Sequence, residues 1–185
     1  MDAKNVTTAK PKVGGAIFRA PLGTKLPVNA KEELAAAFKD LGYISDEGLK
    51  NANGMEASNI KAWGGSTVIT METGKPDDFS YTLLECTNVE TLKSVYGDEN
   101  VSGTLEEGIT IRANSKEQEP HAYVFDMILK GGILKRIVVA NGQLSNVGEI
   151  TYSDSAAVAY AMTLSAVPGW EDGDTHKEYI VKPQS

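Results

Sequence analysis

The sequence contains one cysteine and two histidines in 185 residues, and it has no long hydrophobic run. The single cysteine excludes an internal disulfide framework and says little about the redox compartment. The longest fully apolar run, 156–162, has about seven residues, whereas a membrane-spanning helix needs roughly 20. The amino-terminal stretch MDAKNVTTAKPK has no apolar segment, so we expect neither a secretory signal nor a membrane span.

Motifs that carry chemistry are equally scarce. No serine lies in a G-x-S-x-G elbow, and neither of the glycine-rich phosphate-binding patterns occurs. Cys86 and His121 are the best candidates for catalysis, but neither has a supporting constellation of residues around it. A small buried hydrophobic residue is the favoured interpretation of Cys86. We therefore predict that the protein is not an enzyme and uses no catalytic residue, no cofactor and no metal.

The composition indicates one compact, β-rich domain. Hydrophobic residues make up 41% of the chain and charged residues 23%, as in ordinary globular proteins. Eighteen glycines and few long helical patterns favour strands. No linker or internal repeat divides the chain, so we predict an amino-terminal arm at 1–14, a single domain at 15–182 and a tail at 183–185.

The formal net charge of −7 is unevenly distributed. Residues 1–31 contain six basic residues and one acidic residue, which gives +5, whereas residues 32–185 carry −12. A basic arm can bind nucleic acid or a membrane, and it can equally bind the acidic body of a neighbouring copy. A solvated, flexible tail is a further interpretation, and the residues alone leave these alternatives open.

Helical spacing of apolar residues predicts two short helices, at about 30–41 and at 88–96. Asn29 and Thr87 each begin a capping-box pattern at the expected starts. Residues 42–60 are rich in glycine, asparagine and serine. They predict a long loop, of the kind that is often functional.

β-branched and aromatic residues predict strands through most of the remaining chain. The predicted strands are 13–23, 68–71, 79–87, 102–114, a hairpin at 121–141, 155–167 and an edge strand near the carboxyl terminus. The glycine pair at 131–132 predicts a two-residue hairpin turn. In that register Phe125 shares a face with Val138, while Asp126 lies on the other face. Asp126 is then diagonal to Lys135, in an exposed ion pair of little energetic value.

Four segments, in their order along the chain, resemble the major tail tube proteins of long-tailed, siphovirus-type bacteriophages. They are GAIFRAPLGTKLP (15–27), LGYISDEG (41–48), SVYGDENV (94–101) and FDMILKGG with KRIVV (125–139). The resemblance covers about 13–182. It implies a mainly β fold, namely a tail-tube-type β-sandwich or partial barrel with a flanking short α-helix, an amino-terminal arm and a long loop.

The resemblance also implies a structural subunit that self-assembles into rings of six copies. The stacked rings would form a hollow tube in the virion tail, through which DNA is ejected into the host without specific binding. Tape-measure, tail terminator and baseplate proteins would be the other partners, and the host cytoplasm would be the location before assembly. By analogy, the arm and the long loop make contacts between subunits and rings. The expected contact residues are Lys4, Lys10, Lys12 and Arg19 in the arm, and Tyr43, Asp46, Glu47, Lys50 and Met55 in the loop.

The uneven charge suggests a mechanism for such a tube. An acidic lumen would repel the phosphates of passing DNA, whereas basic charge would bind them by counterion release. The candidate lumen residues are Glu106, Glu107, Glu117 and Glu119. The alternatives are another virion β-sandwich protein, for decoration or tail completion, and a monomeric binding module. The binding module needs an aromatic platform, for which Trp63 and Trp170 are candidates, although we expect both to pack.

Overall fold

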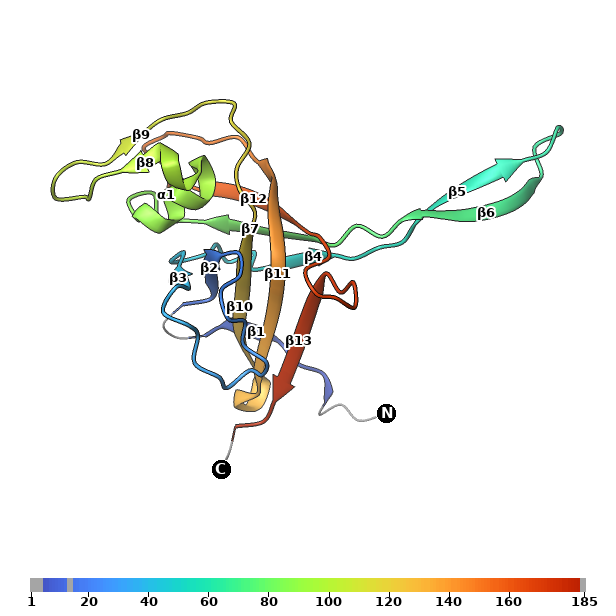
Figure 1. Cartoon of the computed structure of the whole chain (residues 1–185), viewed down its shortest axis with the longest axis horizontal. Helices are drawn as coiled ribbons and strands as arrows, with labels where there is room; N and C mark the ends of the chain where they lie inside the picture. Colours follow the sequence, from blue (N-terminus) through green and yellow to red (C-terminus); the bar gives the residue numbers. More distant parts are fainter. Residues whose placement is uncertain (1–4, 13–14, 184–185) are drawn as a thin grey trace.

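The computed structural model describes residues 5–12 and 15–183, and its largest unit is a nine-stranded antiparallel sheet (Figure 1). The strands follow the order β3-β2-β10-β11-β12-β7-β4, with β1 paired to β10 and β13 paired to β11. Their bounds are β1 Ala9–Pro11, β2 Ile17–Pro21, β3 Lys39–Asp40, β4 Lys50–Ala52, β7 Asp78–Leu83, β10 His121–Leu129, β11 Leu134–Val147, β12 Tyr160–Ala166 and β13 His176–Val181. The predicted mainly β class is confirmed.

The sheet curls so strongly that β7 faces β10. Phe79 of β7 stacks on Phe125 of β10 with ring centroids 5.2 Å apart, although β11 and β12 separate the two strands within the sheet. Alternate residues point into the enclosed core, as the buried Phe79, Tyr81 and Leu83 illustrate. The result is a partial barrel filled with aromatic and aliphatic side chains. Burial of each such side chain stabilises the fold by roughly 1.5–3 kcal/mol.

A second apolar cluster covers the outer face of β10 and β11. Val124 and Val138 lie directly opposite each other and are fully buried. Side chains from residues 26–38, together with Trp170, pack on this face. Both faces of β10 are therefore covered, which explains why all of residues 121–126 are buried.

The predicted helix at 30–41 is wrong, because the segment forms turns and ends in the short strand β3. Asn29 still makes the capping contacts that its sequence position predicts, since its side chain accepts hydrogen bonds from the amides of Lys31 and Glu32, both at 2.8 Å. Arg136 Nη1, however, donates to the carbonyl oxygens of Asn29 at 3.1 Å and Glu32 at 2.7 Å. A helix would use these same carbonyls for its own hydrogen bonds. The apolar residues of the segment pack on the sheet without helical geometry.

The predicted helix at 88–96 is confirmed as α1 (Val89–Tyr96). Its N-cap is Asn88, whose side chain accepts a hydrogen bond from the amide of Glu90 at 3.0 Å. The capping-box pattern had pointed one residue earlier. Gly97 ends the helix at φ +94°, a backbone conformation that glycine adopts without steric cost. A short 3₁₀ turn, η2 (Asp98–Asn100), follows.

The β10–β11 hairpin is confirmed, but its register differs from the prediction by one residue. The turn has three residues instead of two, η3 (Lys130–Gly132), and the ladder pairs Asp126 directly with Arg136. A one-residue slip moves every side chain of a strand to the other face. The predicted apolar face of the hairpin is therefore wrong, and so is the exposed ion pair between Asp126 and Lys135.

The predicted loop at 42–60 is only partly a loop. It contains β4 and continues into β5 (Glu56–Lys61), which pairs with β6 (Thr67–Gly74) in a hairpin. This hairpin projects far from the body, on the side opposite α1 (Figure 1). A smaller hairpin, β8 (Val101–Ser102) with β9 (Thr110–Ile111), lies beside α1.

The sequence AWGGS at 62–66 forms the tip of the projecting hairpin. Ala62 N donates to Ser66 O at 2.8 Å across this turn. Trp63 is fully exposed there, so the expectation that it packs is wrong. Trp170 packs as expected and lies under Lys177 Nζ, which is 4.9 Å from the ring centroid.

Two strands at the carboxyl-terminal end match the sequence prediction. The alanine-rich segment forms β12, in which the large residues Tyr160, Met162 and Leu164 alternate into the core. The predicted edge strand is β13, which pairs with β11 along Leu134 to Val139.

Candidate assembly interface

The hairpin β5–β6 has one apolar face and one polar face. Ile60 pairs with Ile69 across the strands, and Met71 lies two residues further along on the same face. The other face carries Asn59 paired with Thr70, whose Oγ1 donates to Asn59 Oδ1 at 2.7 Å. The three apolar side chains are 45–50% exposed, since no other part of the described chain covers them.

This apolar face is a surface without a partner. A two-stranded hairpin is marginally stable in water by itself, and its apolar side chains stabilise a structure only when something covers them. Each strand also has an open backbone edge, because β5 and β6 form a separate two-stranded sheet. Trp63 at the tip and Met55 just before β5 extend the exposed apolar area. Among the described residues, the hairpin is therefore the strongest candidate for a contact with another chain.

Sequence reasoning missed this hairpin, although a signal was present. The runs 56–61 and 67–72, of which the second is rich in β-branched residues, flank the pair Gly64-Gly65, and glycine pairs between two strands are typical of hairpin turns. The polar first run was assigned to the preceding loop because it lacks β-branched residues apart from Ile60.

The five predicted loop residues are all exposed, but they do not form one surface. Residues 43–50 run along the body beside β7, where Ser45 N donates to Thr82 O at 2.9 Å. Met55 lies apart from them, at the foot of the hairpin. Glu47 forms an ion pair with Lys50 within the same segment. The exposed members of the set are Tyr43, Asp46, Glu47, Lys50 and Met55.

The predicted arm is partly integrated into the sheet. Lys4 lies outside the described residues, whereas Lys10 is exposed in β1, which pairs with β10. Lys12 Nζ lies 3.4 Å from Asp126 Oδ2. Arg19 does not belong to an arm, because it is buried in β2 and pairs within its own chain, with Nη1 2.7 Å from Asp98 Oδ1.

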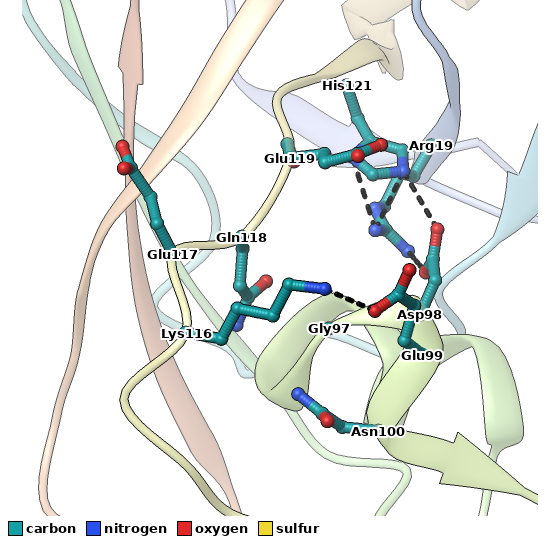
Figure 2. A pocket seen from close by; sticks show the side chains of 10 residues that line it. All are labelled: Arg19, Gly97, Asp98, Glu99, Asn100, Lys116, Glu117, Gln118, Glu119 and His121. Carbon is teal, nitrogen blue, oxygen red and sulfur yellow. Dashed lines mark hydrogen bonds and ion pairs between the residues drawn. The ribbon is translucent and has the colours of Figure 1, made fainter.

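Figure 2 shows Arg19 meeting His121 and Asp98 beside a pocket of about 140 Å³. Arg19 Nη2 lies 2.9 Å from His121 Nε2, which lies 3.0 Å from Asp98 Oδ2. The hydrogen bond from His121 and the charge of Arg19 hold the pKa of Asp98 well below its ordinary value. These contacts tie the end of α1 to β2 and β10. The geometry of the cluster therefore supports anchoring.

The four candidate lumen acids are exposed and lie on the α1 side of the molecule, away from the projecting hairpin. Glu106 and Glu107 lie in the turn between β8 and β9. Glu117 and Glu119 lie on the segment that leads into β10 and line the pocket of Figure 2, in which the Glu117 carboxylate points away from Arg19. The four acids thus lie on two separate segments of this side.

Residues 5–12 and 15–183 contain neither a metal-binding cluster nor a membrane-spanning helix. No group of three or more histidine, cysteine, aspartate or glutamate side chains there has the geometry to hold a metal ion. No helix in the same residues is long and apolar enough to cross a membrane. Cys86 is partly buried and packs against the core, in agreement with its interpretation as a small hydrophobic residue.

Comparisons with known proteins identify the family of this chain. One solved structure that the chain matches is a cryo-EM structure of the anti-feeding prophage cap, the AFP tube terminating cap, with a TM-score of 0.43 and 8% identity. The match covers 96% of this chain and 97% of that one. No curated protein matches the sequence. The family model described as phage tail tube protein matches residues 2–182. Because this match spans nearly the whole chain, the protein belongs to the phage tail tube protein family.

Proposed function

We propose that the chain is the repeating subunit of a siphovirus-type tail tube, which self-assembles into rings, six copies to a ring, that stack into the conduit for DNA ejection. Its place is then the tail of the virion, and the host cytoplasm before assembly. Its role is structural and not enzymatic. A tape-measure protein and the tail terminator and baseplate proteins are its other partners.

The observation that carries this proposal is the uncovered apolar face of the β5–β6 hairpin. Ile60, Ile69 and Met71 lie on an element that touches no core of its own. Association with a second copy would bury this face and pair the open strand edges, which removes two sources of instability at once. Because every copy carries the same projecting hairpin and the same body, such a contact can repeat from subunit to subunit.

The charged residues have separate roles in this proposal. Lys10 and Lys12, at the amino-terminal edge of the sheet, and Lys4 before them make contacts with the acidic body of a neighbouring ring. Glu106, Glu107, Glu117 and Glu119 face the bore and repel DNA phosphates. The contacts of the 43–55 segment, from Tyr43 to Met55, lie between rings.

Electron microscopy of the purified chain with one pair of hairpin variants tests the proposal. Wild-type protein is expected to form hollow tubes of stacked rings. Ile69→Lys places a charge on the apolar face and is expected to leave the chain as monomers in size-exclusion chromatography. Ala57→Lys introduces the same charge on the polar face of the same hairpin, opposite Glu72, and serves as the matched control. It is expected to form tubes.

Two outcomes would contradict the proposal. If Ile69→Lys assembles as well as Ala57→Lys, the apolar face is not an assembly contact. If the wild-type chain stays a monomer at high concentration, or forms only a cap or a decoration on other particles, another virion protein or a monomeric binding module becomes the better description.

A further inference from the structure

Two short linkers join the projecting hairpin to the body. Residues 53–55 connect β4 to β5, and residues 75–77 connect β6 to β7. All of these residues are exposed except Asp77, which is 3% exposed. Exposed linkers of this kind do not by themselves fix the direction of a hairpin. Both linkers leave the body from the β4–β7 ladder, which ends at the pair Ala52 and Asp78, and Asp77 is the buried residue next to this pair.

The Asp77 carboxylate accepts hydrogen bonds from both sides of this junction. Its Oδ1 accepts a hydrogen bond from Asn51 Nδ2 at 2.8 Å and another from Asn53 Nδ2 at 3.3 Å. Asn51 belongs to β4, and Asn53 belongs to the linker that follows β4. Its Oδ2 accepts from Thr175 Oγ1 at 2.5 Å and lies 2.5 Å from His176 Nδ1, at the start of β13. One carboxylate thus connects both feet of the hairpin to an edge strand of the large sheet.

The backbone of Asp77 adds a further tie. Its carbonyl oxygen accepts a hydrogen bond from the amide of Ala166, at the end of β12. The ring of His176 packs edge-on against Phe79, with centroids 5.3 Å apart, so the donor on the β13 side is itself held by the core. Burial of the carboxylate raises its pKa, but the hydrogen bonds from Thr175, Asn51 and His176 outweigh burial, and the pKa lies below its ordinary value. The donors therefore bind a charged acceptor, which makes these hydrogen bonds stronger than neutral ones.

We propose that Asp77 is a positioning residue for the hairpin: its buried carboxylate clamps the two linkers to β13 and thereby fixes the direction in which β5–β6 leaves the body. Beyond the β4–β7 ladder and the contacts of Asp77, the described residues give the hairpin little support, because every residue of β5 is exposed and β6 is exposed from Thr67 to Thr73. A small change of angle at the linkers becomes a large displacement at the tip. The clamp orders the hairpin before binding, so a partner that binds it loses less conformational entropy and meets a surface in a fixed orientation.

The consequence for assembly rests on the proposed function, whereas the clamp does not. A hairpin that leaves every subunit in the same direction makes the same contact at every position of a tube. Release of the clamp is expected to spread the hairpin over many directions, which lowers the fraction of subunits ready to bind.

Pulsed electron–electron distance measurements on the full chain test the clamp directly, with Ile69→Lys included in every sample to keep the chain monomeric. Spin labels are placed at Ser66→Cys in the hairpin tip and Gln143→Cys in β11, both exposed, in a Cys86→Ser background. The chain with Asp77 intact is expected to give one narrow distance distribution. Asp77→Asn, which keeps the shape and removes the charge, is expected to broaden it. Asp172→Asn removes an exposed carboxylate that pairs with Lys177 at 3.0 Å, and is expected to leave the distribution narrow.

Hydrogen exchange gives the size of the effect. In Asp77→Asn, the amides of the ladder end at 51–52 and 78, and the Ala166 amide that donates to Asp77 O, are expected to exchange roughly tenfold faster, which corresponds to about 1.4 kcal/mol of lost local stability. Amides of β10 and β11 are expected to keep their exchange rates. Equal widths and equal rates in Asp77→Asn and Asp172→Asn would overturn the clamp.

If Asp77→Asn does not fold, Thr175→Val decides the question. This variant leaves the carboxylate in place and removes one of its donors with little change of shape. A broader distribution supports the clamp, and an unchanged one overturns it.

Electron microscopy of the same variants, without Ile69→Lys, separates the two proposals. A broadened hairpin in a protein whose wild-type form builds no tubes supports the clamp and contradicts the proposed function, while normal tubes from Asp77→Asn overturn the link between the clamp and assembly.

Discussion

Asp126 of β10 and Arg136 of β11 lie directly opposite each other and form a buried ion pair with two hydrogen bonds. Arg136 Nε donates to Asp126 Oδ1 at 2.6 Å and Nη2 donates to Oδ2 at 2.7 Å. The side chain of Arg136 is 1% exposed and that of Asp126 is 4% exposed. The remaining nitrogen of Arg136 holds the 29–32 segment, and Lys12 approaches the same carboxylate from the amino-terminal side. One pair thus connects the central hairpin to two segments that precede it in the chain.

Asp126→Ala is expected to lower the free energy of unfolding by about 3–5 kcal/mol, because it leaves the Arg136 guanidinium buried without its counter-charge. Urea denaturation followed by circular dichroism measures the change. Glu178→Ala is the control, since Glu178 pairs with Lys135 on the same hairpin in a partly exposed ion pair. It is expected to cost less than about 1 kcal/mol. If the two variants lose similar amounts of unfolding free energy, burial does not make the pair between Asp126 and Arg136 stronger than the exposed pair.

The stabilising effect of Asp98 is expected to depend on pH. The pKa of its carboxyl group in the folded protein lies below the ordinary value of 3.8, because His121 and Arg19 stabilise the charged form. A depressed pKa contributes stability that is fully present above the unfolded-state pKa and is lost as the pH falls toward the folded-state value. Asp98→Asn is therefore expected to be less stable than wild type at neutral pH.

This difference in stability should shrink as the pH falls below about 4, where the unfolded-state carboxyl group becomes protonated. Denaturation curves at several pH values measure it, with Glu171→Gln as an exposed control. A difference that stays constant across this pH range would show that Asp98 acts through packing and not through its charge.

Removal of residues 1–14 is expected to leave the domain folded and to weaken the stacking of rings. The core begins at Ala16, so the truncated chain keeps its apolar clusters. It loses β1 and the contact of Lys12 with Asp126. Tube yield is expected to fall, and the stacking of wild-type rings is expected to weaken as salt screens the arm. Microscopy of tubes at several salt concentrations measures both effects.

A point variant separates charge from loss of the strand. Lys10→Glu reverses an exposed charge in β1, whereas Lys31→Glu makes the same change outside the arm. Only the first is expected to reduce tube length. Normal tubes from the truncated chain would contradict any role of the arm in assembly.

Charge reversal at Glu106 and Glu107 tests the assignment of an acidic bore. Tubes of a Glu106→Lys and Glu107→Lys double variant are expected to retain DNA and slow its ejection, and this retention should decrease as salt rises. Glu171→Lys with Asp172→Lys, which reverses two exposed acids in the turn before β13, is the matched control. Equal ejection rates in the two double variants would remove Glu106 and Glu107 from the bore.

Several features could be predicted from the sequence because their signals are local. The apolar spacing of residues 89–96 and the glycine that follows specify α1, although its cap is one residue later than predicted. The alternation of large and small residues in β12 outweighs the helical preference of its alanines. The glycine pair at 131–132 places a hairpin between β10 and β11. Each of these signals depends on neighbours within one turn or one strand pair.

The sequence by itself therefore determined the β class, the helix α1 and the central hairpin of this tail tube protein. Only the tertiary structure decided the register of that hairpin, the absence of a helix at 30–41 and the isolation of β5–β6. Arg136 binds carbonyls 107 and 104 residues away, and Asp77 binds donors 24 to 99 residues away. The apolar spacing of 30–41 cannot reveal that the distant Arg136 guanidinium binds the carbonyl oxygens a helix would need. The residue types of β5 and β6 likewise cannot reveal that no other sheet covers the hairpin. Such outcomes depend on which distant groups meet, and burial then makes those few contacts strong enough to override local preference.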